Sequence, residues 1–185
     1  ARASYTYLNL ADETAAIAWP IPLTEAIISD ADAGHPRLAA VTPMQPRTTV
    51  ILGAHGQLGR ALQVLYPDAT PLDLADLDLS DAEAVRAYPW QGVGTIINAA
   101  AWTAVDAAET PEGRLGAWAS NVTAVKNLVD VCRHHRITLV HVSSDYVFDG
   151  SGTRPWAETD TPAPLSVYGR TKWEGEQLIQ QSGAR

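Results

Sequence analysis

A glycine-rich turn between an apolar strand and a helix is the feature that most restricts how this chain can fold. Residues 49–52 form a continuous apolar and β-branched run, which is typical of a strand buried on both faces of a parallel sheet. The turn after it spaces Gly53, Gly56 and Gly59 by two residues each, and a helical pattern begins at Gln57. Such glycines let the chain bend sharply and let backbone N–H groups approach a pyrophosphate at the helix N-terminus. The sequence therefore predicts a dinucleotide site on a strand, turn and helix.

The alternative is a glycine-rich turn that binds nothing. An acidic residue downstream favours the dinucleotide, because Asp73 lies twenty positions after Gly53 at the end of a second predicted strand, residues 70–73. A carboxylate there can accept both hydroxyls of an adenosine ribose. It would also repel a 2′-phosphate, which favours NADH over NADPH, although Arg60 or Arg47 could offset that repulsion.

Small side chains follow the next predicted strand, residues 95–98. Ala99, Ala100 and Ala101 stand where larger side chains would block a cofactor's ribose and ring, although a run of alanines also starts many helices. Asp78 has two interpretations as well. It is either an acceptor for the adenine amino group or a solvated loop carboxylate.

The chain after residue 47 repeats the alternation of strand, turn and helix. This repetition predicts an α/β fold, a Rossmann-like doubly wound parallel sheet with helices on both faces. Ser80 and Glu83 form a capping box for a helix that ends before Pro89. The remaining elements are a strand over residues 137–142 and helices over 57–65 and 166–181.

A long helical segment is expected after Pro111, which suits the first turn of a helix. Its apolar residues recur at three- and four-residue steps, so we expect them to face the core rather than a cofactor. They are Leu115, Trp118, Val122, Val125, Val129 and Cys132.

Residues 1–47 differ from the rest, because prolines interrupt them too often for long helices. These prolines are Pro20, Pro22, Pro36, Pro43 and Pro46. We therefore expect an irregular segment over 1–47 and a dinucleotide-binding domain over 48–185.

Ser144, Tyr168 and Lys172 together predict a catalytic site for the reduction of a ketone. Tyr168 and Lys172 stand four residues apart on the last predicted helix, so both project from one face. A tyrosine with its usual pKa of about 10 is a poor acid–base catalyst at neutral pH, but a neighbouring ammonium favours the phenolate and lowers that pKa. Ser144 follows a buried strand, at the edge where doubly wound sheets bind ligands, and its hydroxyl can polarise the same carbonyl. Tyr168 is then the proton donor.

Other interpretations of these residues exist. A tyrosine and a lysine at this spacing are often only a helix surface, and Ser144 could be a nucleophile served by His141, His134 or His135. The residues around Ser144 do not form the Gly-x-Ser-x-Gly elbow that such a nucleophile favours. The two adjacent histidines fall at a helix end, where the helix dipole or solvent accounts for them.

Composition excludes several classes of protein. A net charge of -8 and a pI near 4.9 argue against a nucleic-acid partner, which would need clustered Lys and Arg. The single cysteine, Cys132, excludes an internal disulfide, and no spacing of His with Asp or Glu suggests a metal. No apolar run is long enough to span a membrane and no signal sequence is seen, so we expect a cytoplasmic protein.

Five blocks, in order, resemble the extended short-chain dehydrogenase/reductase family, and within it the dTDP-4-dehydrorhamnose reductases. They span about residues 48–185. Tyr146 follows Ser144 and Asp145 where sugar-nucleotide dehydratases carry a glutamate, which favours reduction over dehydration. The blocks are Gly53–Gly59, NAAAWTAVD at 98–106, SSDYVFDG at 143–150, PWAE at 155–158 and VYGRTK at 167–172.

The resemblance implies an activity and a set of binding residues. The activity is reduction of the C4 ketone of dTDP-4-dehydro-L-rhamnose to dTDP-L-rhamnose with NADH or NADPH, by an enzyme that can be a homo-oligomer. Ser144, Asp145 and Tyr168 would touch the nucleotide sugar. The glycines of the turn, Tyr168 and Lys172 would bind the cofactor, together with Gln57, Leu58, Asp73, Asp78, Leu79, Ala101, Trp102, Thr103 and Val142.

Two departures from the family affect these expectations. Family members continue beyond the Tyr and Lys helix into a C-terminal substrate domain, so residues 48–185 resemble a fragment. Residues 1–47 resemble the C-terminal tail of dTDP-4-dehydrorhamnose 3,5-epimerase, through AAIAWP at 15–20 and IISDADA at 27–33, which implies a bifunctional epimerase/reductase. The alternative function is a catalytically silent dinucleotide-binding module that serves a partner protein.

Overall fold

The computed structural model describes residues 7–40 and 46–183. The chain divides into two compact units, Ala1–Gln45 and Pro46–Arg185. Within the described ranges, no helix is both long and apolar enough to cross a lipid bilayer.

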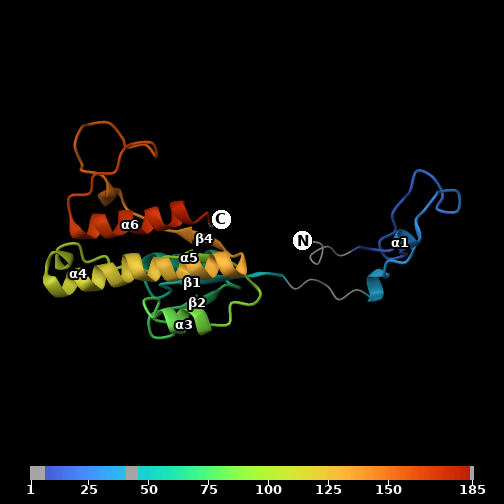
Figure 1. The fold of residues 1–185 in the computed structure, drawn as a ribbon, viewed down its shortest axis with the longest axis horizontal. Helices are drawn as coiled ribbons and strands as arrows, with labels where there is room; N and C mark the ends of the chain where they lie inside the picture. The colour runs from blue at the N-terminus through green and yellow to red at the C-terminus, as the bar shows by residue number, and fades with distance from the viewer. Residues whose placement is uncertain (1–6, 41–45, 184–185) are drawn as a thin grey trace. The chain divides into compact units, whose positions relative to one another are not determined.

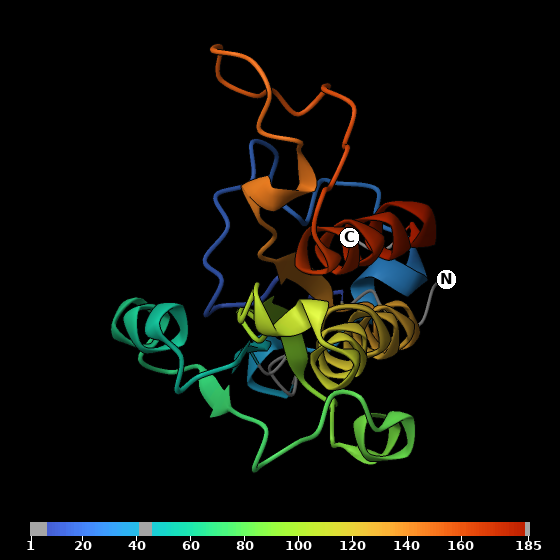
Figure 2. The ribbon, with the colours of Figure 1, turned by 90° about the vertical axis from the view of Figure 1, so that its left-hand side faces the viewer.

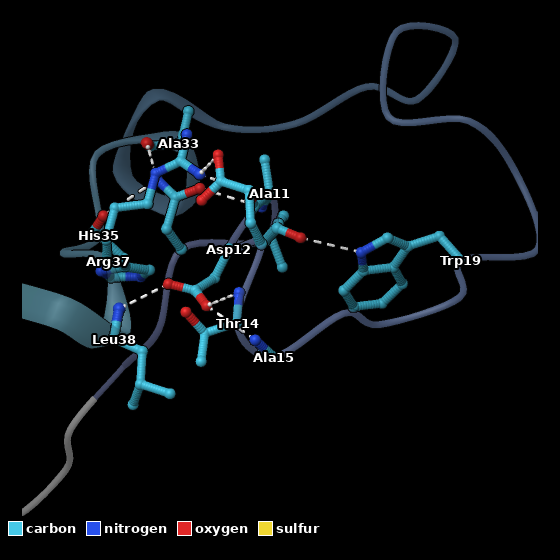
Figure 3. Close-up of polar contacts among 12 residues, drawn as sticks. Ala11, Asp12, Thr14, Ala15, Trp19, Ala33, His35, Arg37 and Leu38 are labelled. Carbon is cyan, nitrogen blue, oxygen red and sulfur yellow. Dashed lines mark hydrogen bonds and ion pairs between the residues drawn. The ribbon is translucent and has the colours of Figure 1, made fainter.

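The first unit is mostly irregular, with one short helix, α1 (Asp30–Ala33), and one 3₁₀ turn, η2 (Leu38–Ala40). Its loops are tied together by Asp12, whose carboxylate accepts the backbone N–H groups of Thr14, Ala15 and Leu38 (Figure 3). Asp12 is only 5% exposed, and these bonds satisfy its buried oxygens. A polar network therefore orders this proline-interrupted segment, which lacks a buried apolar core of its own among its described residues.

The second unit is built on a parallel four-stranded sheet with the order β2-β1-β3-β4. The order reverses beside β1, so the chain winds outward in both directions from the centre, as in doubly wound folds. Register pairs Leu52 with Leu72 on one side and with Asn98 on the other, and Asn98 with His141. The carboxyl ends of all four strands thus lie along one edge. The strands are β1 (Thr48–Leu52), β2 (Thr70–Leu72), β3 (Val93–Asn98) and β4 (Thr138–His141).

Helices cover both faces of this sheet, as the sequence predicted. Figure 2 shows α2 on one side and α5 with α6 on the other, and α5 and α6 pack side by side in Figure 1. The helices are α2 (Gln57–Leu65), α3 (Ala82–Ala87), α4 (Pro111–Trp118), α5 (Ala124–His135) and α6 (Val167–Ser182). Shorter turns are η3 (Ala107–Glu109), the π-helical η4 (Ala119–Thr123) and η5 (Asp145–Val147).

The core lies between the sheet and the α3, α5 and α6 side. Val50, Ile96, Val125 and Leu128 are at most 1% exposed there, and Cys132 lies in the same cluster, as predicted. Burial raises the pKa of the Cys132 thiol to about 12, so this cysteine stays a neutral, unreactive core residue.

Two details of the helices differ from the prediction. Asp81, not Ser80, caps α3, because its carboxylate accepts the N–H groups of Glu83 and Ala84, while the Ser80 hydroxyl donates to Asp78. Leu115 and Trp118 are 75% and 40% exposed, although the apolar stripe placed them in the core. The π-helical turn η4 interrupts the helical period between α4 and α5. The three- and four-residue spacing of apolar residues therefore does not carry through this turn, and those apolar residues face the core only in α5.

Candidate functional site

The candidate site lies along the sheet edge where the parallel strands end. Asp73 follows β2, the glycine turn follows β1, residues 99–103 follow β3, and Val142 leads from β4 to Ser144. Ligands of open α/β sheets bind at this edge, beside the point where the strand order reverses. The predicted residues all follow the carboxyl ends of their strands, as such a site requires.

The glycine turn packs directly against the loop after β3. Gly53 has φ +72°, and a Cβ on it would lie 2.6 Å from the backbone nitrogen of Ala100. A Cβ on Gly59 would overlap the carbonyl oxygen of Gly53. Only glycine fits either position. The N–H groups of Ala54, His55 and Gly56 are bonded within the protein, so a pyrophosphate would meet the unpaired N–H groups of the first turn of α2, beside backbone that carries no side chain.

Asp73 is fastened to this turn. Its Oδ2 accepts the backbone N–H of His55 at 2.8 Å, and its Oδ1 accepts that of Leu74 at 2.9 Å. The His55 bond, followed by the Leu74 bond, lowers the pKa of the Asp73 carboxyl, so Asp73 is a carboxylate at neutral pH. The His55 ring, whose Nδ1 lies 3.7 Å from Oδ2, is a neighbour that the sequence did not suggest.

Asp78 and Leu79 lie on the loop between β2 and α3. Asp78 accepts the backbone N–H and the hydroxyl of Ser80, and the hydroxyl bond, the larger cause, lowers the pKa of this carboxyl. Leu79 packs in the core, and its carbonyl oxygen accepts the Asn127 amide at 2.9 Å. Hydrogen bonds within the loop and to Asn127 of α5 thus hold this loop in place. Contact of Asp78 and Leu79 with a cofactor stays a prediction.

Arg47 cannot offset the charge of Asp73, contrary to one sequence expectation. It precedes Thr48, at the opposite end of β1 from the glycine turn, and its guanidinium donates to the carbonyl oxygens of His135 and Arg136. Those carbonyls end α5, where a cation is favoured by the helix dipole. Arg47 is therefore a helix-capping residue.

Asn121, on the π-helical turn η4, joins the loop after β3 to α6. Its Oδ1 accepts the backbone N–H of Trp102 at 2.9 Å, and its Nδ2 donates to the Trp102 carbonyl and to the Thr171 hydroxyl at 3.0 Å. Asn121 is 1% exposed, and its bond to Thr171 is fully buried, whereas the two bonds to Trp102 are partly buried. It thereby positions the predicted cofactor-lining residues Ala101 and Thr103, which flank Trp102.

The start of α6 is fixed by two side chains. The Ser166 hydroxyl accepts the N–H of Gly169 at 3.0 Å as the helix cap, and the Glu109 carboxylate accepts the N–H of Val167 at 2.7 Å. Both satisfy N–H groups that a helix N-terminus leaves unpaired. Together they set where Tyr168 lies, one residue further on.

Tyr168 and Lys172 are both buried, so they are not an ordinary helix surface. Tyr168 is 8% exposed, packs with Ala108, Ala117 and Val167, and meets the Tyr146 ring edge-on at 5.5 Å between centroids. The packing fixes its ring at the carboxyl-end edge of the sheet.

Lys172 is 2% exposed, and its Nζ donates to the Val142 carbonyl at 2.6 Å. Nζ also lies 3.4 Å from Nε2 of His141. Burial lowers the pKa of Lys172 to about 8, against an opposing effect of Glu176. Lys172 lies one helical turn after Tyr168, and its role toward that phenol stays a prediction.

The Ser144 hydroxyl is only weakly bonded at this edge. Its Oγ accepts the N–H of Tyr146 at 3.1 Å and donates a long hydrogen bond, 3.4 Å, to Oδ1 of Asp145. A carbonyl oxygen could replace Asp145 as the acceptor of this proton. Among the described residues no histidine forms a hydrogen bond with Ser144, and the rings of His134 and His135 meet edge-on at the end of α5, which removes support for a serine nucleophile.

Several residues of this site escaped the sequence interpretation: Asn98, Glu109, Asn121 and the His141 side chain. Each bonds to a segment far away in the chain, as Asn98 does to His141, 43 residues further on. Of these residues, Asn98 alone could be linked to the site from the sequence, because it stands at the end of a predicted strand. In the ranges that the structure describes, no cluster of three or more His, Cys, Asp or Glu could hold a metal.

Comparison with known proteins gives consistent matches for the second unit. A family model described as the RmlD substrate binding domain matches residues 47–185. The dTDP-4-keto-6-deoxy-D-glucose reductase of Streptomyces niveus is 42% identical over 135 residues, 70% of this chain and 46% of that protein. The dTDP-4-dehydrorhamnose reductase of Escherichia coli K12 is 37% identical over 148 residues, 74% of this chain and 48% of that protein.

Solved structures agree. A dTDP-4-dehydrorhamnose reductase from Clostridium acetobutylicum has a TM-score of 0.68 at 37% identity, covering 72% of this chain and 49% of that chain. One from Bacillus anthracis, in complex with NADP, has a TM-score of 0.68 at 32% identity, covering 74% and 50%. The chain thus spans about half the length of these relatives. The family match begins at residue 47, so the epimerase-like tail stays a prediction.

Proposed function

Because the chain belongs to the RmlD substrate binding domain family, we propose that it carries the cofactor site and catalytic groups of a nucleotide-sugar reductase. The reaction is reduction of the C4 ketone of dTDP-4-dehydro-L-rhamnose to the alcohol of dTDP-L-rhamnose. One observation supports this most: a glycine turn that only bare backbone fits and a buried Tyr168 and Lys172 occupy the same sheet edge.

The residues of the turn fit a dinucleotide. Gly53, Gly56 and Gly59 would receive its pyrophosphate at the start of α2, and Asp73 its adenosine ribose. When bound, the reduced nicotinamide supplies a hydride. A relative holds NADP, so we propose NADH or NADPH without preference.

The chain's own residues supply the proton and the polarisation. The Tyr168 phenol donates its proton to the ketone oxygen as the C4 carbon is reduced, and the Lys172 ammonium stabilises the phenolate that this leaves. The Ser144 hydroxyl, whose oxygen is engaged by Tyr146, donates a hydrogen bond to the same ketone oxygen. Asp145, beside it, would contact the sugar. The relatives named above are all called reductases, which gives the silent-module alternative no support.

Tyr168→Phe tests this proposal. Oxidation of NADH or NADPH in the presence of dTDP-4-dehydro-L-rhamnose should fall by about 10²-fold to 10⁴-fold, because the phenol proton is lost. Cofactor binding, followed by nicotinamide fluorescence, should stay nearly unchanged. Tyr66→Phe, at the exposed end of α2, is the matched control. Unchanged turnover in Tyr168→Phe would overturn the mechanism, and cofactor binding without turnover by the unmodified chain would contradict the proposed activity for these residues.

A further inference from the structure

We propose that His141 is a positioning residue which, held in a single tautomer by Asn98, turns a ring N–H toward Lys172 and favours the neutral amine of that lysine. The effect on the tautomer follows from the contacts alone. Its consequence for catalysis rests on the proposed function.

The amide of Asn98 has only one possible orientation. Its Oδ1 accepts the backbone N–H of Ala100 at 3.1 Å, and a backbone N–H can only donate. The Nδ2 group is therefore the one that lies 3.0 Å from Nδ1 of His141. Asn98 is 0% exposed, so no water competes for either end of the amide.

This orientation selects the tautomer of His141. Neutral imidazole has one nitrogen that donates and one that accepts. Since the Asn98 Nδ2 group donates, Nδ1 must accept, and the ring proton is on Nε2. Burial, followed by the nearby Lys172 charge, lowers the pKa of His141 to about 4, so the ring is neutral near pH 7.

The Nε2–H then faces Lys172 Nζ at 3.4 Å. A lysine ammonium has three donors and no acceptor, so the contact sets one donor against another. A neutral amine has a lone pair that can accept this N–H, while one of its own N–H groups still donates to the Val142 carbonyl at 2.6 Å. The pair Asn98 and His141 therefore acts in the same direction as burial, which lowers the pKa of Lys172 to about 8.

Other titratable groups on the neighbouring elements do not reverse this effect. On α6, Glu176 raises the pKa of Lys172, and Tyr168 lies one turn before it. Around α6, Glu109 of η3 is bonded to the Val167 N–H, Asp145 of η5 is exposed, and on α5 Lys126 and Asp130 pair with each other at the surface. Among the described residues, His141 is the one whose ring nitrogen lies within hydrogen-bonding distance of Nζ.

Nuclear magnetic resonance tests the tautomer without any variant. Long-range ¹H–¹⁵N correlation of the ¹⁵N-labelled chain reports which ring nitrogen carries the proton, from about pH 6 to pH 9. His141 should show a protonated Nε2 and an unprotonated Nδ1 throughout. A protonated Nδ1 would overturn the proposal. This readout needs no turnover, so it stands or falls separately from the proposed function.

Asn98→Asp tests the effect on Lys172. A carboxylate can only accept, so it should move the ring proton to Nδ1 and leave the Nε2 lone pair to accept from the ammonium. In the pH–rate profile of cofactor-dependent turnover, the decline at alkaline pH should then move upward by about one pH unit. At a fixed pH on this alkaline limb the rate should rise about tenfold. His134→Gln, at the exposed end of α5, should leave the limb unchanged. If the resonances show the reversed tautomer and the limb does not move, His141 does not tune Lys172.

Discussion

The glycine turn and the surroundings of Lys172 sit at one sheet edge but are built in opposite ways. The turn is backbone: its function depends on the absence of side chains at Gly53 and Gly59, and Gln57 and Leu58 beside it are exposed. The Lys172 site is made of side chains: buried Asn98 and Lys172 and partly buried His141 come from β3, α6 and β4. On our proposal the first site would recognise a ligand by shape, whereas at the second desolvation lowers the pKa of a lysine.

This difference predicts how each site fails. A site made of backbone should be disrupted when a substitution adds a side chain. A site made of buried titratable groups should be disrupted when acid protonates a group or when a substitution removes a hydrogen-bond partner. The predictions that follow test that contrast.

Gly59→Val should have the largest effect. The added side chain overlaps the Gly53 carbonyl, so the turn must open, and we expect the free energy of unfolding to fall by about 3–5 kcal/mol with loss of measurable NADH binding. Urea denaturation and fluorescence titration measure the two. Gly56→Ala is the control for stability, because its Cβ would meet only the Gly53 oxygen, at 3.2 Å. Equal stability of the two variants would show that the turn is not tightly packed.

Acid should destabilise the Lys172 region through His141. The folded-state pKa of His141 is lowered from 6.5 to about 4, so its contribution is fully present above about pH 6.5 and is lost as pH falls toward 4. The loss reaches at most about 3 kcal/mol. Urea denaturation at several pH values should show a smaller acid dependence in His141→Gln than in the native chain. The same slope in both, or a change in His134→Gln, would contradict this assignment.

Asp73→Asn should change which cofactor is preferred. The amide oxygen can still accept the His55 N–H, but the charge that repels a 2′-phosphate is gone, so the affinity ratio should move about tenfold toward NADPH. Titration with both nucleotides measures the ratio. Asp78→Asn, on the loop after β2, is the control, and an equal shift there would mean that general charge, not Asp73, decides the preference.

Glu109→Ala should have the smallest effect, about 1 kcal/mol of stability, because it leaves the Val167 N–H at the start of α6 unpaired. Thermal unfolding measures it, with the exposed Glu25 as the site of a control alanine. No difference between the two would show that Ser166 alone fixes the helix start.

The same contrast explains how much the sequence could predict. The fold class, the carboxyl-end position of the site and the glycine turn were predictable, because strand periodicity and glycine spacing are local. The exposure of Leu115 and Trp118 was not, since a π-helical turn shifts the period without a mark in the sequence. Asn98 and His141 could not be paired either, because 43 residues separate them and only strand register joins them.

The single amide of Asn121 has a consequence for how the site would bind its ligands. By holding both backbone groups of Trp102 and the hydroxyl of Thr171, it ties the loop after β3 to the lysine-bearing helix α6. The ordering of these two segments is then completed during folding rather than at each encounter with a ligand. Affinity gained in this way needs no additional contact, because less conformational entropy is lost on binding.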